Sequence, residues 1–203
     1  SPHLPPALSA LRQRQVGIRD RIGAKPLVHL EAMSSYIIAA TAGHDTTSTT
    51  TAGGLWALAE NPGEFAKLKS DASLIPSYLE ESIRWVTPVK HFMRSATADT
   101  EMHGQKIAKG DWMMLSYPSG NRDEDVFEDP FAFRVDRSPN KHVAFGYGAH
   151  VCLGQHLGRM EMRILWEELL PRLEALELAG APKRMEANFV CGPKSVPISY
   201  RMH

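Results

Sequence analysis

HVAFGYGAHVCLGQHLGRME, residues 142–161, is the stretch around which the rest of this chain is interpreted. Gly146, Gly148 and Gly154 flank Cys152 and allow backbone turns that a side chain would hinder. After the cysteine the pattern predicts a helix, because apolar residues recur at spacings of three and four. This predicted apolar stripe is Leu153, Leu157, Met160 and Ile164. A cysteine at a helix N-terminus favours the thiolate form, and a thiolate in a glycine-rich loop is a good soft metal ligand.

Two other interpretations of Cys152 remain open from the residues alone. A lone cysteine is more often inert core packing than a ligand. A nucleophilic pair with His150 or His142 is the third possibility, but it needs an oxyanion site and an orienting group that the sequence does not reveal.

Composition limits the class of protein. A chain of 203 residues with 43% apolar residues corresponds to one domain, or a large part of one. A net charge of +0 gives no electrostatic case for binding nucleic acid or an anionic membrane. The longest apolar run is too short to span a bilayer, and the first ten residues show no signal-peptide pattern. With only two cysteines there is no disulfide framework, so we expect a cytoplasmic protein.

Residues 27–60 predict one long helix between two prolines. Its middle, TAGHDTTSTTT at residues 41–51, is poor in helix formers and rich in hydroxyls that can bond the backbone. Propensity alone favours a polar face with back-bonded hydroxyls. A weakened midpoint in a central helix is also typical of a functional site.

A second helix is predicted to open at a capping box formed by Ser77 and Glu80 and to end before Pro88. Within it, Glu81 and Arg84 are three residues apart and share one face. On spacing alone this is a surface ion pair that contributes about 0–1 kcal/mol.

The pattern Phe145-x-x-Gly148-x-His150-x-Cys152-x-Gly154 resembles the haem-binding loop of the cytochrome P-450 family, in the form found in its soluble bacterial branch. The resemblance implies a mainly α fold with small β-sheets (α+β), here its C-terminal half with the central long helix and the haem-binding loop. It also implies that the cofactor is haem b, with Cys152 as the ligand of the iron. Other positions that it places against the cofactor are Phe145, Gly146, Gly148, Gly154 and Gly158.

The same resemblance gives roles to residues elsewhere. Residues 42–47 look like the oxygen-activation motif of the family, in which Ala42 and Gly43 let the helix pass over the haem. Asp45 and Thr46 would then deliver protons, and Arg94 and His150 would hold the two haem propionates. Glu81 and Arg84 would form a buried pair that fixes the scaffold, with Arg134 or Arg137 as its third member.

The implied activity is haem-dependent monooxygenation, in which one oxygen atom of O₂ enters an apolar organic substrate. Electrons would come from NAD(P)H through a ferredoxin-type donor with its reductase. In the family an acidic donor docks near the thiolate, which makes Gln155, Arg159 and Arg163 candidate docking residues.

For the domain organisation, we expect a lead-in segment at residues 1–26 and a haem-binding part at residues 27–203. The N-terminal half of the family's fold is absent, so the long helix should expose an apolar face. The alternative functions are a truncated, catalytically inactive fragment that binds haem or acts as an interaction module, and a thiol enzyme.

Overall fold

The computed structural model describes residues 21–22, 25–26 and 28–203, so most of the predicted lead-in lies outside the described residues. The chain forms two units, residues 1–44 and 45–203. In the first unit, β1 (Arg21–Ile22) pairs antiparallel with β2 (Lys25–Pro26), and the long helix α2 (His29–Glu60) begins. The predicted helix at residues 27–60 is therefore correct to within two residues.

The hydroxyl-rich run does not interrupt α2. Thr50 Oγ1 donates to Thr46 O at 2.8 Å and Thr51 Oγ1 donates to Thr47 O at 2.9 Å, which is the back-bonding that propensity favours. In the first unit, the predicted exposed apolar face is present. Leu30 is 74% exposed and Ile38 is 65% exposed, with Met33, Tyr36 and Ile37 also exposed.

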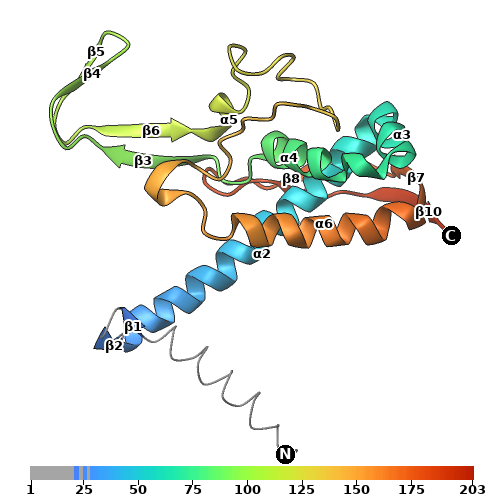
Figure 1. The fold of residues 1–203 in the computed structure, drawn as a ribbon, viewed down its shortest axis with the longest axis horizontal. Helices are drawn as coiled ribbons and strands as arrows, with labels where there is room; N and C mark the ends of the chain where they lie inside the picture. The colour runs from blue at the N-terminus through green and yellow to red at the C-terminus, as the bar shows by residue number, and fades with distance from the viewer. Residues whose placement is uncertain (1–20, 23–24, 27) are drawn as a thin grey trace, which may run out of the picture. The chain divides into compact units, whose positions relative to one another are not determined.

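Three helices, together with the C-terminal part of α2, contribute most of the core of the second unit. These are α3 (Pro62–Ser70), α4 (Ile75–Val86) and α6 (Gln155–Arg172). Figure 1 shows α4 and α6 side by side, and Tyr78 of α4 meets Trp166 of α6 edge-on with ring centroids 4.7 Å apart. The largest apolar side chains of this core have almost no exposure; they are Leu58, Leu68, Tyr78, Val135 and Trp166.

Glycines let α2 lie close to α4. A Cβ on Gly54 would lie 2.6 Å from Ser82 Oγ, closer than side-chain atoms approach one another. Gly53 faces Val86 in the same way. The small residues at the C-terminal end of α2 therefore set the spacing between these two helices.

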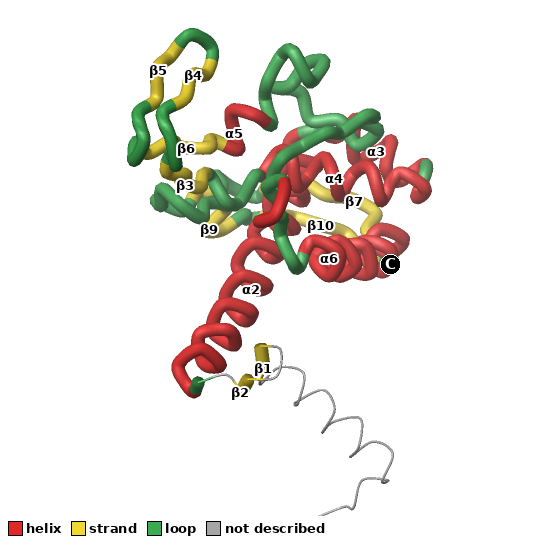
Figure 2. The backbone as a smooth tube through the Cα atoms, turned by 60° about the vertical axis from the view of Figure 1, so that its left-hand side comes forward, coloured by secondary structure: helices red, strands yellow, loops and turns green. Residues whose placement is uncertain are grey.

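The remaining elements are short strands, which are yellow in Figure 2, and short helical turns. All the described sheets are two-stranded and antiparallel, which agrees with the predicted α+β class. The pairs are β3 (His91–Ser95) with β6 (Trp112–Ser116), β4 (Thr100–Met102) with β5 (Gln105–Ile107), β7 (Leu173–Leu178) with β10 (Ile198–Met202), and β8 (Lys183–Arg184) with β9 (Pro193–Ser195). The short helical turns are η1 (Ala72–Leu74), α5 (Tyr117–Gly120) and η2 (Gly148–His150).

The predicted capping box is wrong. Helix α4 begins at Ile75, so Ser77 already lies inside it, and its hydroxyl donates to Val135 O at 2.7 Å. Glu80 does not return to the helix N-terminus, because its carboxylate binds His142 and Arg159 instead. The sequence signal for the start of α4 is instead Pro76, which lies in the first turn of the helix.

The predicted core stripe of α6 is also wrong. Leu153 is fully exposed and Leu157 is 54% exposed, with Met160 and Ile164 also exposed. The buried stripe is Met162, Trp166 and Leu170, which repeats every four residues on another face. The helix also runs past Pro171 to Arg172 before β7 begins.

Candidate functional site

Residues 145–154 form a loop whose backbone is fixed by its own hydrogen bonds. Cys152 N–H donates to Phe145 O at 2.9 Å, and Val151 N–H donates to Gly148 O at 3.1 Å. Gly146 and Gly148 have φ of 71° and 77°, a backbone region that suits glycine. The loop therefore presents Cys152 from a defined position.

The Cys152 thiol is free and its residue is exposed. It is not packed among aliphatic side chains, which excludes inert core packing as its role. Helix α6 begins at Gln155, with Gly154 as the N-cap. The helix therefore begins two residues later in the chain than the sequence pattern predicts.

Behind the loop, Glu80 connects three segments that sequence analysis did not bring together. Its carboxylate lies 2.9 Å from His142 Nε2 and accepts hydrogen bonds from Arg159 Nε at 2.6 Å and Nη2 at 2.9 Å. The Arg159 guanidinium also lies over the Phe145 ring, 4.5 Å from its centroid. Helix α4, the loop and helix α6 are thereby held through one carboxylate.

Burial disfavours a charge on Glu80, but the hydrogen bonds from His142 and Arg159 outweigh it and lower the pKa of Glu80 to about 2. Arg159 is therefore engaged inside the fold, which argues against the docking role expected for it. Arg163 is 54% exposed on its side chain and lies 3.5 Å from Glu167. Its position on the surface remains compatible with docking.

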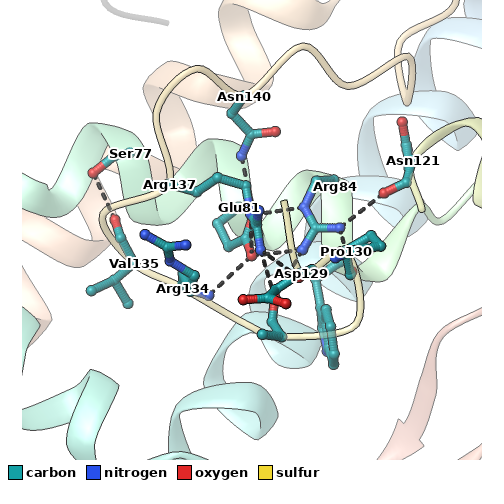
Figure 3. Close-up of polar contacts among 12 residues, drawn as sticks. Ser77, Glu81, Arg84, Asn121, Asp129, Pro130, Arg134, Val135, Arg137 and Asn140 are labelled. Atoms are coloured by element: carbon teal, nitrogen blue, oxygen red, sulfur yellow. Dashed lines mark hydrogen bonds and ion pairs between the residues drawn. The ribbon is translucent and has the colours of Figure 1, made fainter. Parts of the chain in front are cut away.

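The predicted Glu81–Arg84 pair is present and fully buried, which corrects the surface interpretation that spacing alone favours. Arg84 Nε and Nη2 each donate to a different carboxylate oxygen of Glu81, both at 2.7 Å. The third member is Arg137, whose Nε lies 3.0 Å from Glu81 Oε2. Figure 3 shows these side chains converging on the carboxylate, with Asn140 as a further donor at 3.1 Å. Arg134 contributes its backbone N–H, at 3.0 Å, and not its guanidinium.

Asn121 connects this network to the segment directly before the loop. Its carbonyl oxygen accepts from Arg84 Nη1 at 2.9 Å, and its side-chain Oδ1 accepts from Val143 N–H at 2.7 Å. Asn121 has no exposed surface, so both hydrogen bonds are shielded from water. The buried ion pair and the cysteine loop therefore share one rigid support.

The midpoint of α2 lies against α6 near the loop. A Cβ on Gly158 would lie 3.6 Å from Thr47 Oγ1, which is ordinary van der Waals contact. Within the second unit, Asp45 is exposed and Thr46 is half-buried, directly before Thr47. Ala42 and Gly43 belong to the first unit, where both are exposed.

The two candidate propionate donors are free to bind an anion. Arg94 Nη1 donates to Met93 O at 2.9 Å, its one hydrogen bond to the described part of the chain. His150 is exposed on η2, and no hydrogen bond of its ring to residues 28–203 is present. Neither side chain is paired with a carboxylate of the described residues.

Lys90, just before β3, turns its side chain back towards α4. Its Nζ donates to Val86 O at 2.8 Å and to Thr87 O at 2.7 Å, at the C-terminal end of α4. A cation at a helix C-terminus complements the helix dipole.

These residues fit a haem group. The donor set combines one exposed soft thiol with two unpaired cationic or hydrogen-bonding side chains, as an iron porphyrin with two carboxylates requires. Apolar side chains that a macrocycle could cover are also exposed, among them Val151 and Leu157. Within the described residues there is no group of three or more His, Cys, Asp or Glu side chains that could hold a bare metal ion.

No helix in residues 28–203 is both long enough and apolar enough to cross a bilayer.

Comparisons with known proteins agree with this geometry. The family description Cytochrome P450 matches residues 70–200. Over 165 residues the chain is 55% identical to Cytochrome P450-terp of Pseudomonas sp, a match that covers 81% of this chain and 39% of that protein. It is 46% identical over 160 residues to a Steroid C26-monooxygenase of Mycolicibacterium smegmatis, covering 78% of this chain and 40% of the relative.

Among solved structures, the crystal structure of CYP108D1 from Novosphingobium aromaticivorans superposes with a TM-score of 0.88 at 46% identity. That match covers 97% of this chain and 50% of the CYP108D1 chain. The chain thus spans about 40% of the length of these curated relatives. Three observations agree: the family match over residues 70–200, a fold shared over 97% of this chain, and a cysteine loop of the expected form. This chain belongs to the cytochrome P450 family.

Proposed function

We propose that this chain is the thiolate-bearing part of a haem-dependent monooxygenase that inserts one oxygen atom of O₂ into an apolar organic substrate. The observation that carries the proposal is the exposed Cys152 thiol on a backbone-fixed loop, with the threonine-rich run of α2 in contact with α6 at Gly158.

Haem b, when bound, supplies the iron chemistry that activates dioxygen. Cys152 would provide the thiolate that binds the iron, on a backbone fixed by the hydrogen bond from its own N–H to Phe145 O. Arg94 and His150 would hold the two propionates, whose charges need charge-assisted donors in an apolar setting. Phe145 and the loop glycines Gly146, Gly148 and Gly154 would set the height of the thiolate.

Proton delivery would fall to Asp45 and Thr46. The Asp45 carboxylate is exposed, so it can exchange protons with solvent, and the adjacent Thr46 hydroxyl can pass a proton towards the reacting oxygen. Ala42 and Gly43, one turn earlier, are small enough to leave room above the macrocycle.

The partners we propose are an apolar substrate and a ferredoxin-type electron donor with its reductase. A relative of known sequence is named Steroid C26-monooxygenase, which makes fused-ring and other hydrocarbon compounds the first substrates to screen. A reducing cytoplasm would keep the Cys152 and Cys191 thiols free.

The test is the spectrum of the ferrous–CO complex after haem is titrated into the chain. We expect a strongly red-shifted Soret band, which Cys152→Ala abolishes and Cys191→Ala retains, because the proposal assigns the iron to the loop thiol alone. An unshifted band, or a band that survives Cys152→Ala, would refute thiolate ligation and favour the alternative of a haem-binding or interaction fragment without this chemistry.

Proton delivery has a separate test in a catalytically competent, haem-loaded form. Thr46→Ala should keep the red-shifted band and lower the yield of product per electron consumed. Thr51→Ala is the matched control, because it removes a threonine hydroxyl from the same helix, one bonded to Thr47 O at 2.9 Å, to which the proposal gives no role. Unchanged coupling in Thr46→Ala would remove this hydroxyl from the relay.

A further inference from the structure

The second unit contains a cavity of about 550 Å³ that shares no residue with the proposed haem site. It lies among α2, the end of α4, α5 and the turns around β8 and β9. Three cations line it: Lys90, Arg122 and Arg184. A volume of this size falls in the range of small-molecule sites.

The positive charges in this cavity are not neutralised by the described residues. Glu60 is the one carboxylate among the lining residues, and no ion pair joins it to Lys90, Arg122 or Arg184 in residues 28–203. Burial lowers the pKa of Arg122, and the nearby Arg84 and Arg184 lower it further while Glu81 opposes them. Burial likewise lowers the pKa of Lys90. Cys191 raises this pKa, whereas the nearby Arg122 and Arg184 lower it further. The cavity therefore concentrates positive charge.

Hydrogen-bond donors are left over for a ligand. Arg122 uses Nη2 on Trp85 O at 2.9 Å, and its remaining N–H groups have no acceptor among the described residues. Trp56 also lines the cavity, and its Nε1 is buried without a hydrogen-bond partner among the described residues. A buried donor of this kind normally has a partner. Arg184 lies over the Trp56 ring, 4.5 Å from its centroid, and forms no ion pair with residues 28–203.

Much of the remaining wall is apolar. The ring of Trp85, with the Arg122 guanidinium 5.1 Å from its centroid, faces the cavity together with Val86, Met185 and Pro193. An inorganic anion would meet the cations but leave this wall in contact with water. An anion with a flat or branched hydrocarbon body would satisfy both.

We propose that this cavity binds a small organic carboxylate, with its charge on Arg122 and Arg184 and its hydrocarbon part between Trp56 and Trp85. The site is separate from the proposed haem chemistry and does not depend on it.

The experiment is isothermal titration of the chain, without haem, with sodium benzoate at low ionic strength. We expect saturable binding that weakens as salt is added. Benzyl alcohol, which has the same ring but no charge, should bind at least about tenfold more weakly. Inorganic phosphate should also bind more weakly than benzoate, because it gains nothing from the apolar wall.

Variants then locate the site. Arg184→Gln removes an exposed cation, so it should fold normally and weaken benzoate binding about tenfold. Trp56→Phe keeps an aromatic side chain but replaces the indole and its N–H by a phenyl ring, and we expect a smaller loss of about threefold to tenfold. Arg172→Gln, a surface arginine paired with Glu168, is the control and should bind benzoate as the unmodified chain does.

The proposal is overturned by the absence of saturable benzoate binding, by equal affinity for benzyl alcohol or phosphate, or by unchanged affinity in Arg184→Gln. Because no haem is present, none of these results bears on Cys152, and the two proposals fail independently.

Discussion

The buried network around Glu81 gives the sharpest prediction. Glu81 has no exposed surface and accepts two hydrogen bonds from Arg84 at 2.7 Å, with Arg137 Nε at 3.0 and 3.1 Å from its two oxygens. Glu81→Gln keeps the shape of the side chain but leaves two buried guanidinium groups without a counter-charge. Removing one partner of a buried ion pair costs about 3–5 kcal/mol. We therefore expect the free energy of unfolding to fall by about that amount.

Urea unfolding followed by far-UV circular dichroism measures the loss. With an m-value of about 2 kcal/mol/M, a loss of about 4 kcal/mol lowers the urea midpoint by about 2 M. Glu168→Gln is the matched control, because Glu168 pairs with Arg172 at 3.0 Å on the surface with side-chain exposures of 69% and 61%. Its cost should be about 0–1 kcal/mol. A Glu81→Gln midpoint equal to that of the control would show that the two arginines do not rely on this carboxylate.

Two further predictions concern α4 and its contacts. The pKa of Glu80 is lowered from an ordinary 4.5 to about 2. The ionised carboxylate therefore stabilises the fold fully above pH 4.5, and this contribution is lost as the pH falls towards 2. The stability difference between the unmodified chain and Glu80→Gln, measured by urea unfolding, should therefore be present at pH 6 and shrink towards pH 2; a difference that does not change with pH would contradict the assignment. Gly54→Ala places a methyl group 2.6 Å from Ser82 Oγ and should destabilise by about 1–3 kcal/mol, whereas Gly63→Ala in α3 meets nothing within 4 Å and should be neutral or stabilising by up to about 1 kcal/mol. Thermal unfolding separates the two, and equal midpoints would show that α2 and α4 can move apart.

Some of this structure follows directly from local sequence. The bounds of α2 are marked by prolines, and the Glu81–Arg84 pair follows from a spacing of three on a helix. The glycines around Cys152 indicate the backbone turns that the structure has at Gly146 and Gly148, but the residues alone left the exposure of the thiol open.

Other features depend on tertiary contacts that local sequence does not encode. Helix α6 carries apolar residues on more than one face, so periodicity could not decide that Met162 and Trp166 face the core while Leu157 and Ile164 do not. Arg134 and Arg137 differ only in which group reaches Glu81, and that depends on the turn between them. The pairing of Glu80 with His142 and Arg159 spans 62 and 79 residues, beyond any local signal.

The adjacent carboxylates Glu80 and Glu81 hold different parts of the molecule. Successive residues of an α-helix are rotated by about 100° around its axis. Glu80 therefore turns to the cysteine loop and α6, while Glu81 turns to Arg137 and the segment before the loop. A residue inserted between them would swing one carboxylate away from its arginine without unwinding the helix. We thus expect α4 to accept substitutions on its outer face but no change of length at this step, since the two neighbouring carboxylates must reach two different arginines.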